Sequence, residues 1–201
     1  QFTDGTQAFV AEALELPKER VKVYGTMMGG GFGRRAFPDF AVEAAEISRE
    51  IGRPVKVIWS REDDIRHDYY RPSTYNVLRG GIDDQGSIKA WEHKLVAPSI
   101  AKSILPAMGG LAPQWIPDWM INAVIKGAGF LLENSDPTTS EGSVEMPYKI
   151  ENIDVKHIFH DPGIPLGPWR SVGHSQNAFI TESFIDELAN LAEQDPYQYR
   201  R

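Results

Sequence analysis

The chain has 201 residues, of which 41% are hydrophobic and 24% charged, a composition typical of folded globular proteins that excludes disordered and collagen-like classes. With 21 Lys and Arg against 28 Asp and Glu, the net charge is -7 and the basic residues are scattered, so we do not expect nucleic acid as a partner. The longest amphipathic stretch, 115–132, is interrupted by Pro117, Asp118, Asn122 and Lys126, and we expect no membrane-spanning segment.

The cysteine content and the two ends of the sequence indicate what we expect to lie outside this chain. The sequence has no cysteine, which excludes disulfides, thiolate metal sites and cysteine-ligated iron–sulfur clusters within it, so an electron carrier must lie elsewhere. The chain starts at Gln1 without an initiator methionine and stops at Arg201, just after a helix-start signal. We therefore expect an internal piece, truncated at both ends.

The first 60 residues predict two helices that alternate with two strands. Apolar residues recur at helical spacing over 9–14, with Thr6 as the expected N-cap, and 21–28 reads as a buried strand that runs into a glycine cluster. A second helix is expected over 40–51, followed by a half-buried strand at 55–59. The charged segment 61–64 is expected to turn at the surface.

The rest of the chain predicts a hairpin, a helical region, one more strand and a long helix. Two β-rich runs, 75–82 and 88–95, flank Asp83-Asp84-Gln85-Gly86, whose glycine suits a hairpin turn. The other expectations are mostly helix over 99–132, a polar loop at 134–142, a strand at 153–159, an extended proline-rich path at 161–168, an apolar-striped helix through 180–191, and a helix start at Asp195-Pro196. The predicted class is α+β, a mixed sheet with packed helices.

Glycines at 29–33 form the first candidate site. Gly29, Gly30, Gly31, Phe32 and Gly33 leave several backbone N–H groups unencumbered between a predicted strand and a predicted helix, an arrangement able to bind an anion or an oxo group. The loop lacks the Lys-Ser/Thr of a P-loop and the spacing of a dinucleotide fingerprint. Taken alone, it is equally well explained as a tight turn.

Two arginines follow the glycines directly. Arg34 and Arg35 place two guanidinium groups beside open backbone donors, so bidentate contacts to phosphate or pyrophosphate are expected. Each arginine taken separately is also compatible with plain surface charge.

A second candidate site spans 167–177, just before the striped helix. Polar donors gather there, Arg170, Gln176 and Asn177 among them, and helix N-termini attract anions. The alternative makes Ser175 an N-cap and Arg170 an ordinary ion-pair partner, with Trp169 in the core. No metal-ligand set is expected, because His157 and His160 would point to opposite faces of a strand.

Both motifs, together with 54–64, His67-Asp68 and 70–72, resemble in order and spacing the molybdopterin-binding subunit of the xanthine dehydrogenase and aldehyde oxidase family. The match is to the branch of isoquinoline 1-oxidoreductase β subunits and related bacterial aldehyde dehydrogenases, and it covers the whole chain. The resemblance implies that 1–201 is a partial molybdopterin-binding domain.

Site roles follow from this resemblance. The glycine loop, Arg34 and Arg35 would lie at the cofactor, and Gln176 and Asn177 would contact it. Gln1 stands where a family glutamine hydrogen-bonds a molybdenum oxo group, and Arg170 where an arginine steadies charge developing on the substrate. Two departures matter. Ala36 replaces the glutamate typical of purine-oxidising relatives, and the family's glutamate base lies outside this chain.

The resemblance also implies an activity and partners for the complete subunit. It would bind molybdopterin cytosine dinucleotide with molybdenum and oxidise an aldehyde or N-heterocycle, with water as the oxygen source. Electrons would leave through a small subunit with two [2Fe-2S] clusters and onward to a cytochrome c. The fragment alone is expected to be inactive, and the periplasm is slightly favoured over the cytoplasm. From another class, the chain is compatible with a non-catalytic scaffold or anion-binding domain of the same fold.

Overall fold

The computed structural model describes residues 2–109, 112 and 115–201. Within them, helices pack with a mixed three-stranded sheet, so the predicted α+β class is confirmed. The elements are α1 Thr3–Ala13, η1 Lys18–Arg20, η2 Arg34–Ala36, α2 Asp39–Ile51, α3 Arg61–Arg66, β1 Tyr75–Ile82, β2 Ile88–Ala97, α4 Ile100–Gly109, α5 Asp118–Asn134, α6 Pro137–Ser140, β3 Asn152–Phe159, α7 His174–Leu191 and α8 Pro196–Tyr199. No helix among the described residues combines the length and apolar character needed to cross a bilayer.

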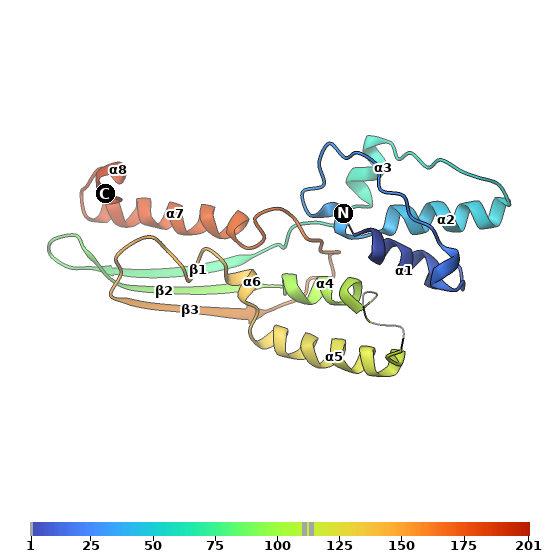
Figure 1. The fold of residues 1–201 in the computed structure, drawn as a ribbon. Coiled ribbons are helices and arrows are strands. Elements are labelled where there is room, and N and C mark those ends of the chain that lie inside the picture. Colours follow the sequence, from blue (N-terminus) through green and yellow to red (C-terminus); the bar gives the residue numbers. More distant parts are fainter. Residues whose placement is uncertain (1, 110–111, 113–114) are drawn as a thin grey trace. The chain divides into compact units, whose positions relative to one another are not determined.

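The chain forms two compact units, each built from three segments. The first unit comprises 1–71, 103–129 and 164–169, and the second comprises 72–102, 130–163 and 170–201. In the first unit α1 and α2 lie side by side (Figure 1), and the Arg49 guanidinium donates to the Ala13 carbonyl at 3.1 Å. α2 ends as predicted, at Gly52, whose φ of 68° is the left-handed cap that glycine favours.

Two local predictions, the N-cap at Thr6 and the surface turn at 61–64, are wrong. α1 begins at Thr3, and the expected N-cap Thr6 lies inside its first turn, where its hydroxyl donates to the Phe2 carbonyl at 2.9 Å. The segment predicted to turn at 61–64 instead begins α3. Ser60 forms a capping box with Asp63, which satisfies two backbone N–H groups that a surface turn would leave to water.

The strands predicted at 21–28 and 55–59 do not form in the described residues. Backbone at both places is extended or irregular, with Tyr24 81% and Met27 fully exposed. Burial does alternate along 55–59, because Val55 and Val57 are half-buried between exposed neighbours. The alternation predicted over 55–59 is confirmed, whereas the burial predicted over 21–28 is wrong. A strand also needs a paired neighbour, and no described segment pairs with either stretch.

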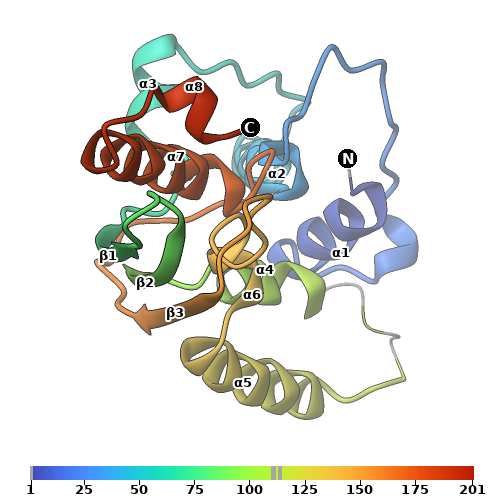
Figure 2. The same cartoon turned by 90° about the vertical axis from the view of Figure 1, so that its left-hand side faces the viewer.

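The second unit is a sheet with α7 lying along one of its faces (Figures 1 and 2). β1 and β2 form the predicted hairpin, closed at Gly86 with φ 84°, and β3 lies parallel to β2. Its core is built from Ile88, Trp91, Ile185 and Leu188. The predicted stripe of α7 ends at Leu188, since Leu191 is 63% exposed.

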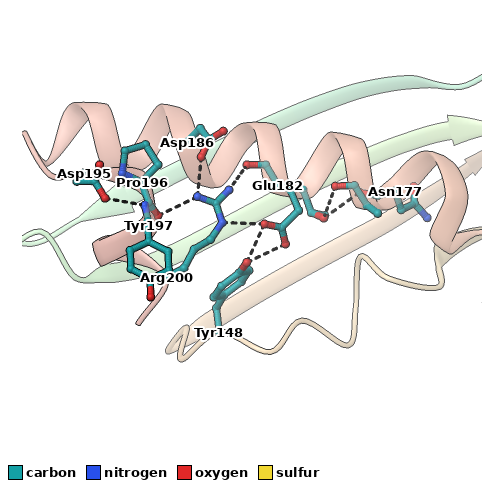
Figure 3. A network of polar contacts seen from close by, with 10 residues as sticks. Tyr148, Asn177, Glu182, Asp186, Asp195, Pro196, Tyr197 and Arg200 are labelled. Atoms are coloured by element: carbon teal, nitrogen blue, oxygen red, sulfur yellow. Dashed lines mark hydrogen bonds and ion pairs between the residues drawn. The ribbon is translucent and has the colours of Figure 1, made fainter.

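The short helix α8 is tied to α7 through one arginine (Figure 3). Arg200 donates to the Glu182 carboxylate at 2.9 Å and to the Asp186 carboxylate at 2.6 Å, and the Tyr148 hydroxyl donates to Glu182 at 2.8 Å. Asp195 caps α8 as predicted, accepting from the backbone N–H groups of its first turn. Within the second unit, α8 is therefore fixed to α7.

One buried carboxylate joins α6 to the start of α4. Asp136, 2% exposed, accepts hydrogen bonds from the hydroxyls of Ser99, Thr138 and Thr139 and from the Ala101 N–H. It also caps α6, in a region where the sequence predicted only a polar loop. Burial alone would raise the pKa of Asp136, but these hydrogen bonds outweigh burial and hold the pKa below its ordinary value.

We expect Asp136→Ala to lower the free energy of unfolding at pH 7 by about 2–4 kcal/mol, because several buried donors lose their acceptor. A carboxylate with a lowered folded-state pKa stabilises the fold above its unfolded-state pKa, so the difference from wild type should shrink as the pH falls below about 4. Urea denaturation across pH measures both effects. Asp161→Ala, at an exposed Asp that accepts the Gly163 N–H, is the matched control and should cost about 0.5 kcal/mol. Equal losses for the two variants would contradict this account.

Candidate functional site

The glycine loop is packed against the segment that leads to the second motif. A Cβ on Gly33 would lie 2.4 Å from the Pro168 carbonyl oxygen, and its φ of 89° is one that side chains rarely adopt. Phe32 beside it also has a positive φ, 48°. By contrast, a Cβ on Gly29 would meet no atom within 4 Å. The loop is thus held at its Gly33 end and open at its Gly29 end.

Arg34 is buried against two carboxylates. Its guanidinium donates through Nη1 and Nη2 to the two Asp39 oxygens, at 2.9 and 2.8 Å, and through Nε to Asp68. Burial would lower the pKa of Arg34, but the bonds to Asp39 and Asp68 outweigh burial and raise the pKa above its ordinary value. From the sequence we expected this guanidinium to contact a phosphate. In the structure, three of its five N–H donors are bonded to carboxylates of the first unit.

Arg35 has different surroundings. Its guanidinium carbon lies 5.0 Å from the centre of the exposed Phe40 ring. It lines a cavity of about 450 Å³ together with Phe40, Trp59 and Arg61. The Trp59 indole N–H donates to Glu43 at 2.9 Å on the same wall. Arg34 also lines this cavity, but of the two adjacent arginines only Arg35 is exposed.

Tyr69 links the loop region to the proline-rich segment. Its carbonyl accepts the Trp169 indole N–H at 3.1 Å, and a Cβ on Gly167 would lie 2.6 Å from the Tyr69 Cβ. Next to it, Tyr70 exchanges backbone hydrogen bonds with the Pro165 carbonyl and the Gly167 N–H, at 2.8 and 3.2 Å. This bridge supports the predicted extended path around Leu166, whereas Gly163 earlier in the segment is a bend with a φ of 74°.

In the second motif the backbone is strained. Ser171 and Val172 have φ of 72° and 41°, the latter rare for a β-branched residue. With Phe32, they make three of the five described non-glycine residues of positive φ, so strain gathers in the two motifs that the sequence singled out. Arg170, just before them, is exposed.

Gln176 and Asn177 lie in the first turn of α7. The Gln176 amide nitrogen and oxygen are both buried and have no partner among the described atoms. Asn177 is fully buried, and its amide nitrogen donates to the carbonyls of Thr139 and Glu141, at 2.8 and 2.9 Å. α7 starts after Gly173, so the alternative of Ser175 as N-cap is wrong; the Ser175 hydroxyl bonds the Arg170 carbonyl at 3.2 Å.

The predicted site residues are therefore divided between the units, with the glycine loop, Arg34 and Arg35 in the first and Arg170, Gln176 and Asn177 in the second. Gln1 lies outside the described residues. Sequence reasoning missed Asp39, Asp68 and Tyr69 as supports of the loop. The sequence does not single them out, because Asp39 and Asp68 are two of eight carboxylates between positions 39 and 68.

Comparison with known proteins gives consistent matches. A family model described as the molybdopterin cofactor-binding domain matches residues 1–104. The beta chain of isoquinoline 1-oxidoreductase from Brevundimonas diminuta is 29% identical over the whole chain, which covers 23% of that relative. The aldehyde oxidoreductase molybdenum-binding subunit PaoC of Escherichia coli K12 is 28% identical over 100% of this chain and 23% of its own. The chain thus spans about a quarter of the length of these relatives.

Two solved structures share the fold. Quinoline 2-oxidoreductase from Pseudomonas putida 86 superposes with a TM-score of 0.66 at 20% identity, covering 98% of this chain and 22% of the other. Aldehyde oxidoreductase from Desulfovibrio gigas superposes with a TM-score of 0.61 at 18% identity, covering 95% of this chain and 18% of the other.

Proposed function

Because this chain belongs to the molybdopterin cofactor-binding domain family, we propose that it supplies part of the cofactor site of a molybdenum hydroxylase large subunit. Residues 1–201 would be part of one molybdopterin-binding domain. The cofactor would be molybdopterin cytosine dinucleotide, and the substrate an aldehyde or an N-heterocycle. Relatives named for aldehyde and isoquinoline oxidation support this substrate class.

Two features of the chain fit such a cofactor. The Gly29 end of the loop is open where a side chain would stand, so a ligand can approach its backbone closely. The Gln176 amide has both polar atoms buried and unpaired among the described residues, and a buried amide without a partner is costly unless a ligand or water completes it. The two buried, unpaired polar atoms of the Gln176 side chain are the strongest support for a cofactor site.

The cofactor, when bound, supplies the metal that takes up electrons from the substrate carbon. The backbone N–H groups of 29–33 would bind its negatively charged edge, and Arg35 would pair with a phosphate. Gln176 and Asn177 would hold it from the second motif, with Gln1 at an oxo group. Arg170 would steady negative charge that develops on the substrate. The general base would come from outside this chain.

Electron transfer would need a partner subunit. The chain has no cysteine to ligate a cluster, and several relatives are named as subunits of larger enzymes, including one of nicotinate dehydrogenase from Pseudomonas putida. A small subunit with [2Fe-2S] clusters, passing electrons to a cytochrome c, is the proposed partner.

Gly29→Val tests the cofactor role of the loop. Because a Cβ at Gly29 meets nothing in the protein, the midpoint of thermal unfolding of the cofactor-free protein should stay unchanged. Molybdenum content of the full-length subunit should fall roughly tenfold, as expected for about 1.4 kcal/mol weaker binding. Gly127→Val in α5, also without a neighbour within 4 Å, controls for adding the side chain and should load normally. Normal loading of Gly29→Val would reduce the loop to a structural turn.

A further inference from the structure

A buried charge cluster in the first unit joins three stretches of chain. Arg34 is 8% exposed, and the side chains of its partners Asp39 and Asp68 are 25% and 17% exposed. A guanidinium stays charged when it is withdrawn from water, so its burial is costly unless carboxylates compensate the charge, and here two do so. The five-donor fork suits this, since two donors lie parallel toward Asp39 and a third points to Asp68.

The cluster fixes the exit of the glycine loop. Arg34 follows Gly33 directly and begins η2, whereas Asp39 is the first residue of α2. Asp68 lies just after α3, and its carboxylate also accepts the Tyr69 backbone N–H at 2.8 Å. The Arg34 side chain therefore ties the loop to the helix after it and to a chain segment more than 30 positions away.

Tyr69 extends the cluster to a second segment, 165–169, which we call the strap. The Arg34 guanidinium lies 4.9 Å above the Tyr69 ring, and the same residue accepts the Trp169 indole N–H through its carbonyl. The Pro168 carbonyl of the strap lies close to Gly33. The loop and the strap are thus in contact with each other, and both are anchored to the 68–70 segment.

We propose that Arg34, with Asp39 and Asp68, is a positioning residue that holds the glycine loop against the strap. The exposed Arg35 is then the arginine of the pair that contacts the ligand. This inference rests on the proposed function for its catalytic consequence, but the mechanical link does not depend on it. We call the contacts of Arg34 with Asp39 and Asp68 the clamp. Removing the clamp should loosen the loop and the strap together. The cofactor should still bind, with less accurate placement of the reacting groups, so kcat falls while KM changes little.

Amide hydrogen exchange on the full-length protein tests the mechanical link. Lysine at position 34 keeps the charge but cannot reach both carboxylates with a planar fork. Arg34→Lys should raise exchange at least about tenfold in both 29–37 and 165–169, with 75–97 unchanged. Asp68→Asn, which leaves the Asp39 pair intact, should do the same to a smaller degree and serves if Arg34→Lys fails to fold. Arg79→Lys, at an exposed arginine paired with Glu92, is the matched control. Loosening of the loop without the strap, or of neither, overturns the proposal.

Kinetics of the loaded enzyme test the positioning role. Arg34→Lys should keep its molybdenum content within about twofold of wild type and lose about tenfold in kcat per bound molybdenum. Arg35→Lys should instead lose molybdenum. An Arg34 variant that loses molybdenum but keeps normal kcat per bound metal would make Arg34 a direct cofactor ligand and overturn the proposal. Wild-type protein without molybdenum would refute the proposed function, and the exchange result would still decide the clamp.

Discussion

Gly33→Val is expected to destabilise the chain by about 2–6 kcal/mol, the sum of backbone strain and overpacking. Its Cβ would stand 2.4 Å from the Pro168 carbonyl oxygen and 2.8 Å from the carbonyl carbon, so backbone rather than a flexible side chain must move. Valine also opposes the φ of 89°. Because the loop and the strap meet at this contact, molybdenum content of the full-length subunit should fall with stability.

Two milder substitutions separate the cost of backbone strain from the cost of overpacking. Gly33→Ala and Gly52→Ala both force a side chain into a positive φ, but a Cβ at Gly52 meets nothing within 4 Å. Gly52→Ala should therefore cost about 1–2 kcal/mol from conformation alone, and Gly33→Ala distinctly more. Chemical denaturation of both variants measures the difference. Equal costs would show that the Pro168 contact gives way without strain and would remove the packing argument.

Arg170→Lys should lower kcat by roughly tenfold to a thousandfold, about 1.4–4 kcal/mol, with molybdenum content preserved. Lysine keeps the positive charge and loses the planar fork, so an interaction formed with charge that develops during reaction is weakened more than substrate binding. Steady-state kinetics per bound molybdenum give the number, with KM expected to change little.

The same preparation distinguishes a cofactor role for Arg170. If its guanidinium holds a cofactor phosphate, the lysine variant should be purified with depleted molybdenum and cytidine but with near wild-type activity per bound metal. Unchanged content and unchanged kcat together would make Arg170 a structural arginine.

Local patterns predicted the elements whose causes are local. The hairpin followed from Gly86 between two alternating runs, the end of α2 from Gly52, and α8 from Asp195-Pro196, and each is confirmed. The stripe of α7 was also read correctly up to Leu188. In these cases the residues that decide the structure lie within a few positions of one another.

Structural features that depend on residues far apart in the sequence cannot be predicted from local patterns. The apolar residues of 21–28 and the alternation of 55–59 both predict a strand, but pairing is set by a neighbouring strand that a local pattern cannot reveal. For Arg34 the sequence predicts a phosphate contact but does not reveal the pairing with Asp68, which lies 34 positions away. For α3 the deciding residues are local, because Ser60 and Asp63 stand at capping-box spacing and start the helix within the charged segment.

The central claim is that these residues serve a molybdenum cofactor, and the metal and nucleotide content of the full-length subunit tests it most directly. Protein purified with its partner from a molybdenum-replete host should contain close to one molybdenum per large subunit, and acid hydrolysis should release an equal amount of cytidine monophosphate. Gly29→Val and Arg35→Lys should lower both quantities in parallel. Correctly folded wild-type protein with neither molybdenum nor cytidine would contradict the account and leave a scaffold of the same fold.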